Sequence, residues 1–475
     1  MSNANSDAVD SALRTPHSAL PTPGGARELL AVAGPLILSA GFLTVQLCLD
    51  RIFLTWNGND EAAASMPAVM LFSTLFGLLQ YTLLYTSVFV SQYLGANRPE
   101  RVGPVLWQSV RLAVVGGCGF LLLIPLAGPL FEMTGHSQEV ARHEADYFRA
   151  LCLAVPSAAV VAVVNSFFSG RGKTWTVLAV NLVGLGVNAP LAYAWILGEW
   201  GFPQFGPAGA GYATACGSVA SAVAGLALIL RKKYEAEFRT RSGWRFDWPL
   251  TKRVLRFGVP NGVMYAVDMT AWTAFVFLTG LMSKVEGAAT NVAFTINLVA
   301  FLPLMGVGQG VEILVGRRQG ERRPDLSEKT TWTGLKLNLG YAVVVSVLYA
   351  VLPWVFTWPF GLNAKAGEWQ QLEPTVHVLL LFVAVYTVGD AVNVTVNFAL
   401  RGAGDTRFVA ALAVGLAWPV MVIPTWLAAV RGWGVYGAWV FASAYIFALA
   451  VAFVIRFRGG KWRSMRVIEA KVTPD

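Results

Sequence analysis

The chain has few charged residues and few of the residues that build disulfides or metal sites. Only 13% of its 475 residues are charged, whereas 55% are hydrophobic, and the mean hydropathy is +0.55. Soluble domains carry about 25% charged residues, so the composition excludes an ordinary soluble enzyme. The four cysteines show no paired spacing, and we expect neither a disulfide nor a metal site among Cys48, Cys118, Cys152 and Cys216.

Several motifs that would indicate an enzyme or a nucleotide-binding protein are also missing. His136 and His143 have glutamates nearby but no HExxH or Cys/His pattern, so we expect solvated loop residues there. The GRGKT run ending at Thr174 resembles a phosphate-binding loop, but Phe167 stands where that motif requires glycine. No cluster of reactive His, Cys and Ser residues shares one depth, which argues against a membrane enzyme. Residues 1–26 lack the apolar core of a signal peptide, so we expect a disordered cytoplasmic tail.

What the chain has instead is a series of long apolar runs. About 20 apolar residues suffice for a helix to cross a bilayer, and non-alternating runs of that length must be helices. The sequence therefore predicts an all-α polytopic membrane protein with twelve transmembrane helices, at about 29–54, 67–94, 107–131, 146–168, 175–198, 208–230, 257–283, 289–315, 332–356, 375–400, 407–429 and 434–456.

The basic residues are distributed unevenly between the loops. Loops after even-numbered spans hold twenty Lys and Arg residues, nine of them between Arg231 and Arg256, whereas loops after odd-numbered spans hold four. By the positive-inside rule, the even loops and both termini are cytoplasmic. The net charge of +9 is therefore explained by membrane orientation, and we expect no nucleic-acid partner.

The two halves of the chain repeat each other. Pro35 and Pro260 open corresponding halves, and similar offsets relate Trp107 to Trp332 and two short motifs to their second copies. Those motifs are Gly95-x-x-Arg98-Pro99 with Gly320-x-x-Arg323-Pro324, and Asn165-x4-Gly170-x-Gly172-x-Thr174 with Asn397-x4-Gly402-x-Gly404-x-Thr406. Because each copy contains six spans, an even number, the copies have the same orientation in the membrane.

This repeat predicts two parallel six-helix lobes with a cleft between them, the architecture of an alternating-access carrier. We assign residues 27–230 to the N-lobe, 231–256 to a cytoplasmic interlobe linker, 257–456 to the C-lobe and 457–475 to a cytoplasmic tail. We also expect Pro303, Gly306, Gly308 and Gly310 to interrupt the eighth span, and Pro419 and Pro424 the eleventh.

Acidic residues inside the apolar spans are the candidate functional groups. Insertion of such a charge costs roughly 2.5–3.5 kcal/mol, so it usually serves a function. Asp268 and Asp390 lie at similar depth in the seventh and tenth spans, both in the C-lobe, and Asp50 lies near the outer end of the first span. The position 225 residues before Asp268 is Leu43 and that after Asp50 is Phe275, so the acids are not duplicated with the scaffold.

The neighbours of these acids give further expectations. Two buried carboxylates cannot both stay ionised and unpaired, so a proton or a metal cation must occupy their site. Asp50 could point into the N-lobe with Arg51 outward, or both could lie at the membrane interface. Tyr265 is a candidate substrate-contacting residue, and Trp272 could stack on a flat cation or, more commonly, pack in the core.

Two further charged residues in the spans have structural explanations. Glu312 lies late in the eighth span, where it could be a third acid on a cation path. We expect it instead to form an ion pair with Arg317 or Arg318. Arg111 begins the third span, and we expect its side chain to extend to the membrane surface.

Taken in order on twelve spans, these motifs resemble the multidrug and toxic compound extrusion (MATE) family, in its NorM-like branch. The resemblance rests on Pro35 with Asp50, SQYLGANRPERV closing the second span, Pro260 with Asp268, PLMGVGQGVEILVG in the eighth span and DAVNVTVNFALRGAGDT in the tenth. It implies an inner-membrane exporter that exchanges Na⁺ or H⁺ for bulky, often cationic organic compounds. It also implies that Asp268, Asp390 and Tyr386 bind the coupling cation, with Asp50 as an additional N-lobe acid.

Two departures from the family pattern bear on the mechanism. The seventh-span acid is usually glutamate in the family, and Asp268 is one methylene shorter. The DinF-like branch carries an aspartate four residues after an asparagine in the fifth span, where this chain has Asn188 and then Ala192. The resemblance therefore implies coupling in the C-lobe.

The sequence thus predicts a monomeric antiporter of the inner membrane with no cofactor besides its coupling ion. Asp268 and Asp390 would be metal ligands if that ion is Na⁺. Because acids rather than arginines lie at mid-depth, a flippase for a lipid-linked oligosaccharide is the alternative that we rank second.

Overall fold

A computed structural model describes residues 22–57, 59–133, 137–361 and 367–469. Twelve helical segments in these residues are long and apolar enough to cross a membrane, which confirms the predicted all-α architecture. Of the N-terminal segment predicted to be disordered, residues 1–21 lie outside the described residues, as does His136.

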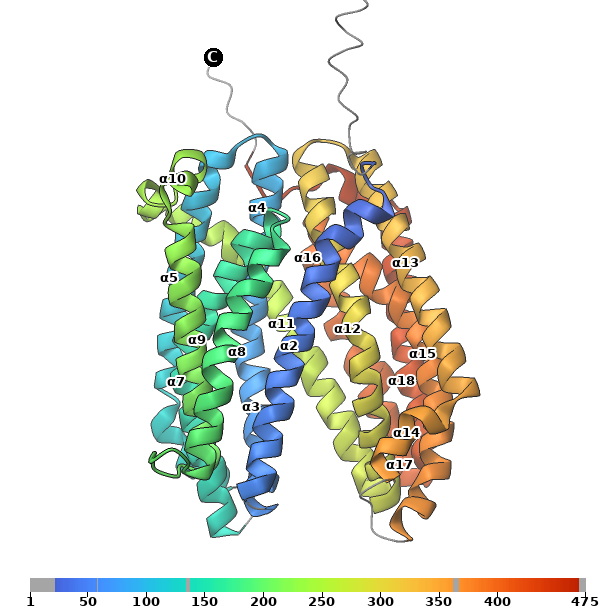
Figure 1. The fold of residues 1–475 in the computed structure, drawn as a ribbon. Coiled ribbons are helices and arrows are strands. Elements are labelled where there is room, and N and C mark those ends of the chain that lie inside the picture. The colour runs from blue at the N-terminus through green and yellow to red at the C-terminus, as the bar shows by residue number, and fades with distance from the viewer. Residues whose placement is uncertain (1–21, 58, 134–136, 362–366, 470–475) are drawn as a thin grey trace, which may run out of the picture.

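The helices of the N-lobe stand side by side in the blue-to-green half of the molecule (Figure 1). Their bounds are α2 (Ala26–Asn57), α3 (Asn59–Leu84), α4 (Thr86–Gly95), α5 (Val102–Leu121), α6 (Ala127–Glu132), α7 (Gln138–Gly170), α8 (Thr174–Leu197) and α9 (Pro207–Ile229). Helices α3 and α4 together supply the second span. The third span comprises α5, α6 and the short 3-10 turns η1 (Pro99–Arg101) and η2 (Ile124–Leu126).

The C-lobe forms the yellow-to-red half (Figure 1). Its helices are α11 (Trp248–Met282), α12 (Lys284–Gly320), α13 (Pro324–Val351), α14 (Pro353–Gly361), α15 (Glu368–Ala403), α16 (Thr406–Leu416), α17 (Ile423–Arg431) and α18 (Gly434–Arg458). Between the lobes, the linker forms α10 (Lys232–Phe238) and η3 (Ser242–Trp244), and η5 (Lys461–Ser464) follows α18. Helix α11 begins nine residues before the expected position 257, because Asp247 caps it by accepting the N–H of Leu250.

The packing of the two lobes follows the internal repeat. In the N-lobe, α2 packs on α8, α3 and α5 on α7, and α7 on α9; their counterparts in the C-lobe make the matching contacts, α11 on α16, α12 and α13 on α15, and α15 on α18. The lobes meet through α2 against α12 and α3 against α11, which are exchanged by the same correspondence. This reciprocity is the contact pattern of a pseudo-two-fold axis between parallel lobes.

The repeated glycines explain why the lobes can approach so closely. A Cβ on Gly95 would lie 1.9 Å from the carbonyl oxygen of Arg317, and one on Gly320 would lie 2.2 Å from that of Gln92. Position 320 follows 95, and 317 follows 92, by the same 225 residues. The repeated Gly-x-x-Arg-Pro motif therefore forms a symmetric backbone crossing of α4 with α12.

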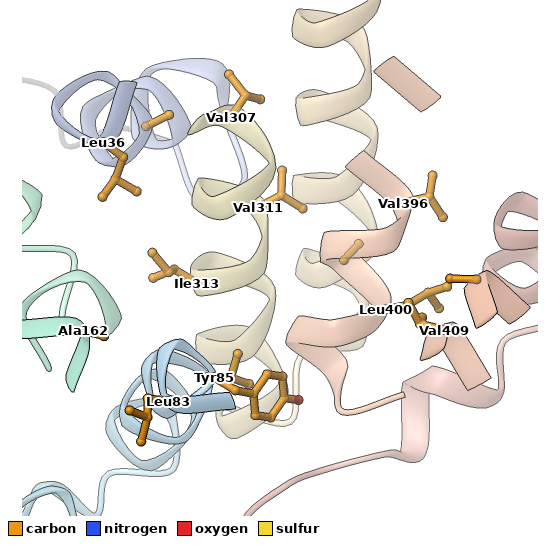
Figure 2. Close-up of a cluster of buried hydrophobic side chains, with 14 of the residues drawn as sticks. Leu36, Leu83, Tyr85, Ala162, Val307, Val311, Ile313, Val396, Leu400 and Val409 are labelled. Atoms are coloured by element: carbon orange, nitrogen blue, oxygen red, sulfur yellow. The ribbon is translucent and has the colours of Figure 1, made fainter. Parts of the chain in front are cut away.

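The interlobe contacts lie in one half of the molecule, which we call the basic end because it carries α10 and η5. Leu36 of α2 lies near Val307 and Val311 of α12, and Tyr85, between α3 and α4, lies beside α12 (Figure 2). Toward the opposite end, Leu47 of α2 and Leu281 of α11 are exposed. The lobes are thus packed together at the basic end and separate toward the other, as the splayed ribbons indicate (Figure 1).

Prolines in the spans have different effects from those expected. Helix α12 runs without a break through Pro303, and its glycines instead admit neighbouring helices: a Cβ on Gly306 would lie 2.2 Å from Ile37. The expected interruption of the eighth span is therefore wrong in this region. The eleventh span is irregular as expected, because a π-helical segment, η4 (Ala417–Val422), contains Pro419, and Pro424 follows it.

Candidate functional site

Two membrane-embedded acids of the C-lobe lie close together. Asp268 projects from α11 and Asp390 from α15, and their carboxylates are near enough to interact electrostatically. Asp390 is 8% exposed, whereas Asp268 is partly exposed. The side-chain amide of Asn393, one turn along α15, donates to Oδ1 of Asp390 at 3.4 Å. The site therefore combines one buried acid with one that solvent can reach.

Tyr445 of α18 connects these acids. Its hydroxyl donates to Oδ1 of Asp268 at 2.8 Å, and the same hydroxyl lies within electrostatic range of Asp390. Because Tyr445 is 1% exposed, its position is fixed by packing. The site is thus built by three helices of one lobe and presents carboxylate, phenol and amide oxygens, which are the ligand atoms that hard cations prefer.

An aromatic cluster surrounds the acids. Tyr386, one turn before Asp390, is buried, and its ring stacks on Trp439 with centroids 6.0 Å apart. Trp272 makes edge-to-face contacts with Tyr445, Phe275 and Phe294. Trp272 is therefore a packing residue that remains partly exposed, and the cluster lowers the water content around the carboxylates.

Tyr265 lies elsewhere, at the contact between the lobes. Its ring stacks on Tyr81 of α3 with centroids 4.0 Å apart, and a Cβ on Gly77 would strike it at 2.0 Å. The structure therefore places Tyr265 and Trp272 on the same helix but in different surroundings.

Asp50 lies in the other lobe. It is 5% exposed on α2, within electrostatic range of Tyr147 of α7, and its Oδ1 has no hydrogen-bond partner among the residues that the structure describes. Arg51 is exposed, so the neighbours diverge as the helical geometry predicts. The structure brings Asp268 and Asp390 together and keeps Asp50 apart from them.

The ion-pair partner expected for Glu312 is wrong. Its Oε1 lies 3.1 Å from Nη2 of Arg401 on α15, whereas Arg317 and Arg318 pair with Glu321, and Arg318 also with Glu28. Glu312 and Arg401 both belong to repeated motifs, but their separation of 89 residues hid the pairing. Both side chains are buried, and the hydroxyl of Tyr85 donates to the carbonyl of Arg401 across the lobes at 2.7 Å.

A second charged cluster closes the basic end. The carboxylate of Glu469, beyond η5, accepts from Arg98 at 2.8 Å, from Arg101 at 3.1 Å, from Tyr93 at 2.8 Å, and from Arg253 of α11. Burial alone would raise the pKa of Glu469, but hydrogen bonds from its own backbone N–H and Tyr93, and the charges of Arg101 and Arg98, hold it below its usual range. One carboxylate thus joins both lobes.

Sequence reasoning missed Tyr445, Trp439 and Glu469. A tyrosine or tryptophan within an apolar span looks the same whether it packs in a core or reaches a carboxylate. Glu469 stands in a polar tail where an acid is unremarkable. Among the described residues there is also no group of three or more His, Cys, Asp and Glu side chains that could hold a metal ion.

A buried acid site in a two-lobe, twelve-helix membrane protein defines a polytopic membrane transporter. Comparison with known proteins identifies its kind. The MatE family model matches residues 35–194 and 260–427, one stretch in each lobe. The chain belongs to the MATE family of transporters and is not an enzyme, which confirms the resemblance noted in its sequence.

Curated relatives and solved structures agree with this assignment. The chain is 27% identical over 437 residues to a "Probable multidrug resistance protein NorM" of Burkholderia mallei, covering 91% of this chain and 92% of that one. The protein of the same name from Xanthomonas campestris pv. campestris is 28% identical, covering 94% and 97%. A structure titled "Outward-facing conformation of a multidrug resistance MATE family transporter of the MOP superfamily" matches with a TM-score of 0.83 at 18% identity, covering 91% and 96%.

Proposed function

We propose that this protein is a cation-coupled antiporter that exports organic, often cationic, small molecules. The observation that carries the proposal is the pairing of Asp268 with Asp390 beside Tyr445 in the C-lobe. Asp268, Asp390 and Tyr386 would form the cation site, and Asp50 would be a separate acid of the N-lobe. The NorM names of the relatives support export of drug-like compounds.

The coupling follows from the electrostatics of the site. Two like charges in a poorly solvated pocket repel each other unless a cation or a proton neutralises them. A cation that binds one conformation more tightly shifts the population toward it. One charge moving through 100 mV releases ~2.3 kcal/mol, which can drive a substrate against a modest gradient. Either Na⁺ or H⁺ satisfies this argument.

The interlobe contacts support alternating access. Gly95, Gly320, Tyr85 and Glu469 join the lobes at the basic end, whereas Leu47 and Leu281 are exposed toward the other end. The positive-inside rule assigns the basic end and both termini to the cytoplasm. With bacterial relatives, this supports an outward-facing state in a cell inner membrane.

The exported compound would bind between the lobes. Trp272 is partly exposed beside the acids, and Tyr265 is partly exposed at the interlobe contact. Aromatic faces attract organic cations within about 6 Å, and nearby carboxylates strengthen that attraction. We therefore propose that Trp272 and Tyr265 contact the compound as it crosses.

The lipid-linked oligosaccharide flippase is a weaker candidate. Such a substrate carries phosphates, which arginine and lysine side chains recognise. Arg401, the arginine near the interlobe contact, is already paired with Glu312, and Asp268 and Asp390 would repel phosphate.

Transport in inside-out vesicles tests the proposal. A fluorescent cationic dye should accumulate when an inward dye flux is driven by an imposed outward Na⁺ or H⁺ gradient, and only one of the two gradients should suffice. Dye accumulation that is independent of both gradients would contradict cation coupling. Transport of a lipid-linked oligosaccharide with no dye flux would favour the flippase.

A further inference from the structure

A groove on the outer surface of the N-lobe at the basic end is separate from the transport site. It has a volume of about 600 Å³ and lies between α5, the end of α9 and the linker turn η3. Its lining residues are Trp107, Val110, Arg111, Val114, Val115, Leu230, Arg241 and Trp244. Helix α5 supplies most of one wall, and the interlobe linker supplies the other.

One part of the groove faces hydrocarbon. Val114 and Val115 are exposed on a span, with Val115 72% exposed, so the surrounding bilayer must cover them. Val110 lies one turn closer to the basic end and continues the same apolar strip. An acyl chain lying along α5 would bury these three side chains without exposing any polar group.

The other part of the groove carries two guanidinium groups. Nη1 of Arg111 donates to Oε1 of Gln108 at 3.0 Å, and Nη2 donates to the carbonyl of Trp244. Nε of Arg241 donates to the carbonyl of Leu230 at 2.7 Å. These contacts hold both groups in place with neutral partners. Several N–H groups of each arginine remain for another acceptor.

The charge of these arginines is incompletely balanced. Among the described residues, no carboxylate lies within ion-pair distance of either guanidinium group. Glu235 is the nearby acid, but it binds the backbone N–H groups of Arg241 and Ser242, which lower its pKa. Exposed Lys232, Lys233 and Arg245 on the same linker add to the positive potential.

Tryptophans mark the depth of the groove. Nε1 of Trp107 donates to the carbonyl of Thr240 at 2.6 Å, and Trp244 is exposed at the groove rim. Exposed Phe246 and Trp248 follow on the linker. Tryptophan concentrates at the headgroup level of a bilayer, so the two arginines lie where phosphates of a leaflet lie.

We propose that this groove binds an anionic phospholipid from the leaflet at the basic end. Its phosphate would accept hydrogen bonds from Arg111 and Arg241, and one acyl chain would cover Val110, Val114 and Val115. The unbalanced charge selects a lipid with net negative charge over a zwitterionic one. Because η3 is one wall of the groove, the bound lipid fixes the interlobe linker against the N-lobe.

Native mass spectrometry of the full-length protein tests this site. The protein is released from nanodiscs containing equal amounts of phosphatidylglycerol and phosphatidylcholine, and the bound lipids are counted. We expect retention of phosphatidylglycerol over phosphatidylcholine, reduced roughly tenfold in Arg111→Gln/Arg241→Gln. The matched control is Lys232→Gln/Lys233→Gln, which removes the same charge from the same linker outside the groove and should retain the preference.

Other outcomes would overturn the proposal. Equal retention of both lipids by the unaltered protein would exclude selection for negative charge. An undiminished preference in the double arginine variant, or an equal loss in the lysine control, would show that general charge attracts the lipid. Displacement by millimolar inorganic phosphate would indicate a soluble anion. If the double variant does not fold, Arg241→Gln alone and Val115→Trp, which fills the acyl part, should each reduce the preference.

Discussion

Asp268 is one methylene shorter than the glutamate that the family resemblance leads one to expect, and Tyr445 compensates for this difference. The tyrosine hydroxyl reaches Oδ1 of Asp268 at 2.8 Å from the neighbouring helix α18. It therefore orients a short side chain that would otherwise have more freedom to turn away from Asp390. At the residue scale, the cation site depends on this hydrogen bond.

Replacing Tyr445 by phenylalanine should weaken coupling without unfolding the protein. A hydrogen bond of this kind contributes about 0.5–1.5 kcal/mol. We expect the cation concentration that half-saturates transport to rise roughly two- to tenfold. Titration of dye transport against the coupling ion measures the change. Tyr436→Phe is the control, because Tyr436 is exposed on the same helix; an unchanged midpoint in Tyr445→Phe would contradict a role for the hydroxyl.

The buried pair of Glu312 and Arg401 should serve stability. Removing one partner of a buried ion pair leaves the other charge unbalanced, which typically costs about 3–5 kcal/mol. Glu312→Gln should therefore lower the thermal unfolding temperature in detergent while coupling stays nearly intact in the protein that folds. The double variant Glu312→Gln/Arg401→Gln should recover part of the loss. Loss of coupling at full stability would instead place Glu312 on the cation path.

The candidate site was partly readable from the sequence. Asp268 and Asp390 stood out because charges are rare in apolar spans, and the repeat placed both in one lobe. The distances between helices could not be read. Glu312 illustrates the limit, since Arg317 and Arg318 were the nearest basic residues in sequence but Arg401, from another helix, is the partner.

At the scale of elements, the crossing of α4 with α12 joins the lobes. Gly95 and Gly320 allow the two backbones to touch, and Gln92 adds a hydrogen bond from its amide to the carbonyl of Gly402 at 3.0 Å. Gln92 also accepts the backbone N–H of Val467 through its Oε1 at 2.9 Å, so the segment after α18 is held against both lobes.

Adding one methyl group at this crossing should separate the helices. In Gly95→Ala, the new Cβ would meet a backbone oxygen that cannot move independently. We expect a loss of about 1–3 kcal/mol, as for other overpacked contacts, and a lower unfolding temperature. Gly320→Ala should cause a similar loss because the contact is reciprocal. Gly41→Ala, where no atom lies within 4 Å, is the control; equal effects at all three positions would contradict the proposed crossing.

Glu469 should hold the basic end closed. Its folded pKa is lowered, so its contribution is present at neutral pH and is lost as the pH falls through that value, in the acidic range. Glu469→Gln should lengthen the distance between spin labels on exposed Lys173 and Lys329, measured by electron paramagnetic resonance. Glu328→Gln, which breaks a pair with Arg463 within the C-lobe, is the control. An unchanged distance in Glu469→Gln would exclude this role.

The elements themselves were largely predictable. Apolar runs fixed the number of spans, and the repeated motifs fixed their pairing in two lobes. The helix ends were less predictable, because amphipathic turns outside the bilayer extend them, as at the start of α11. The helix breaks also differed, since Pro303 is accommodated without interrupting α12 whereas Pro419 lies in a π-helical segment.

At the scale of the whole molecule, the lobes differ in what they carry. Their scaffolds repeat each other in contacts and in glycine positions, but Asp268, Asp390 and Tyr445 belong to the C-lobe alone. A symmetric scaffold can rock about its axis, and an asymmetric charge site can bias that motion. The account therefore assigns motion to the repeat and coupling to the unrepeated acids.

Gradient-driven dye transport by Asp268→Asn and Asp390→Asn in reconstituted vesicles tests this claim most directly. Both changes keep side-chain volume nearly constant and remove one negative charge. The account predicts that each variant folds and inserts, yet loses transport driven by the coupling ion, whereas Glu328→Gln transports as the unaltered protein does. Full gradient-driven transport by both aspartate variants would contradict the account.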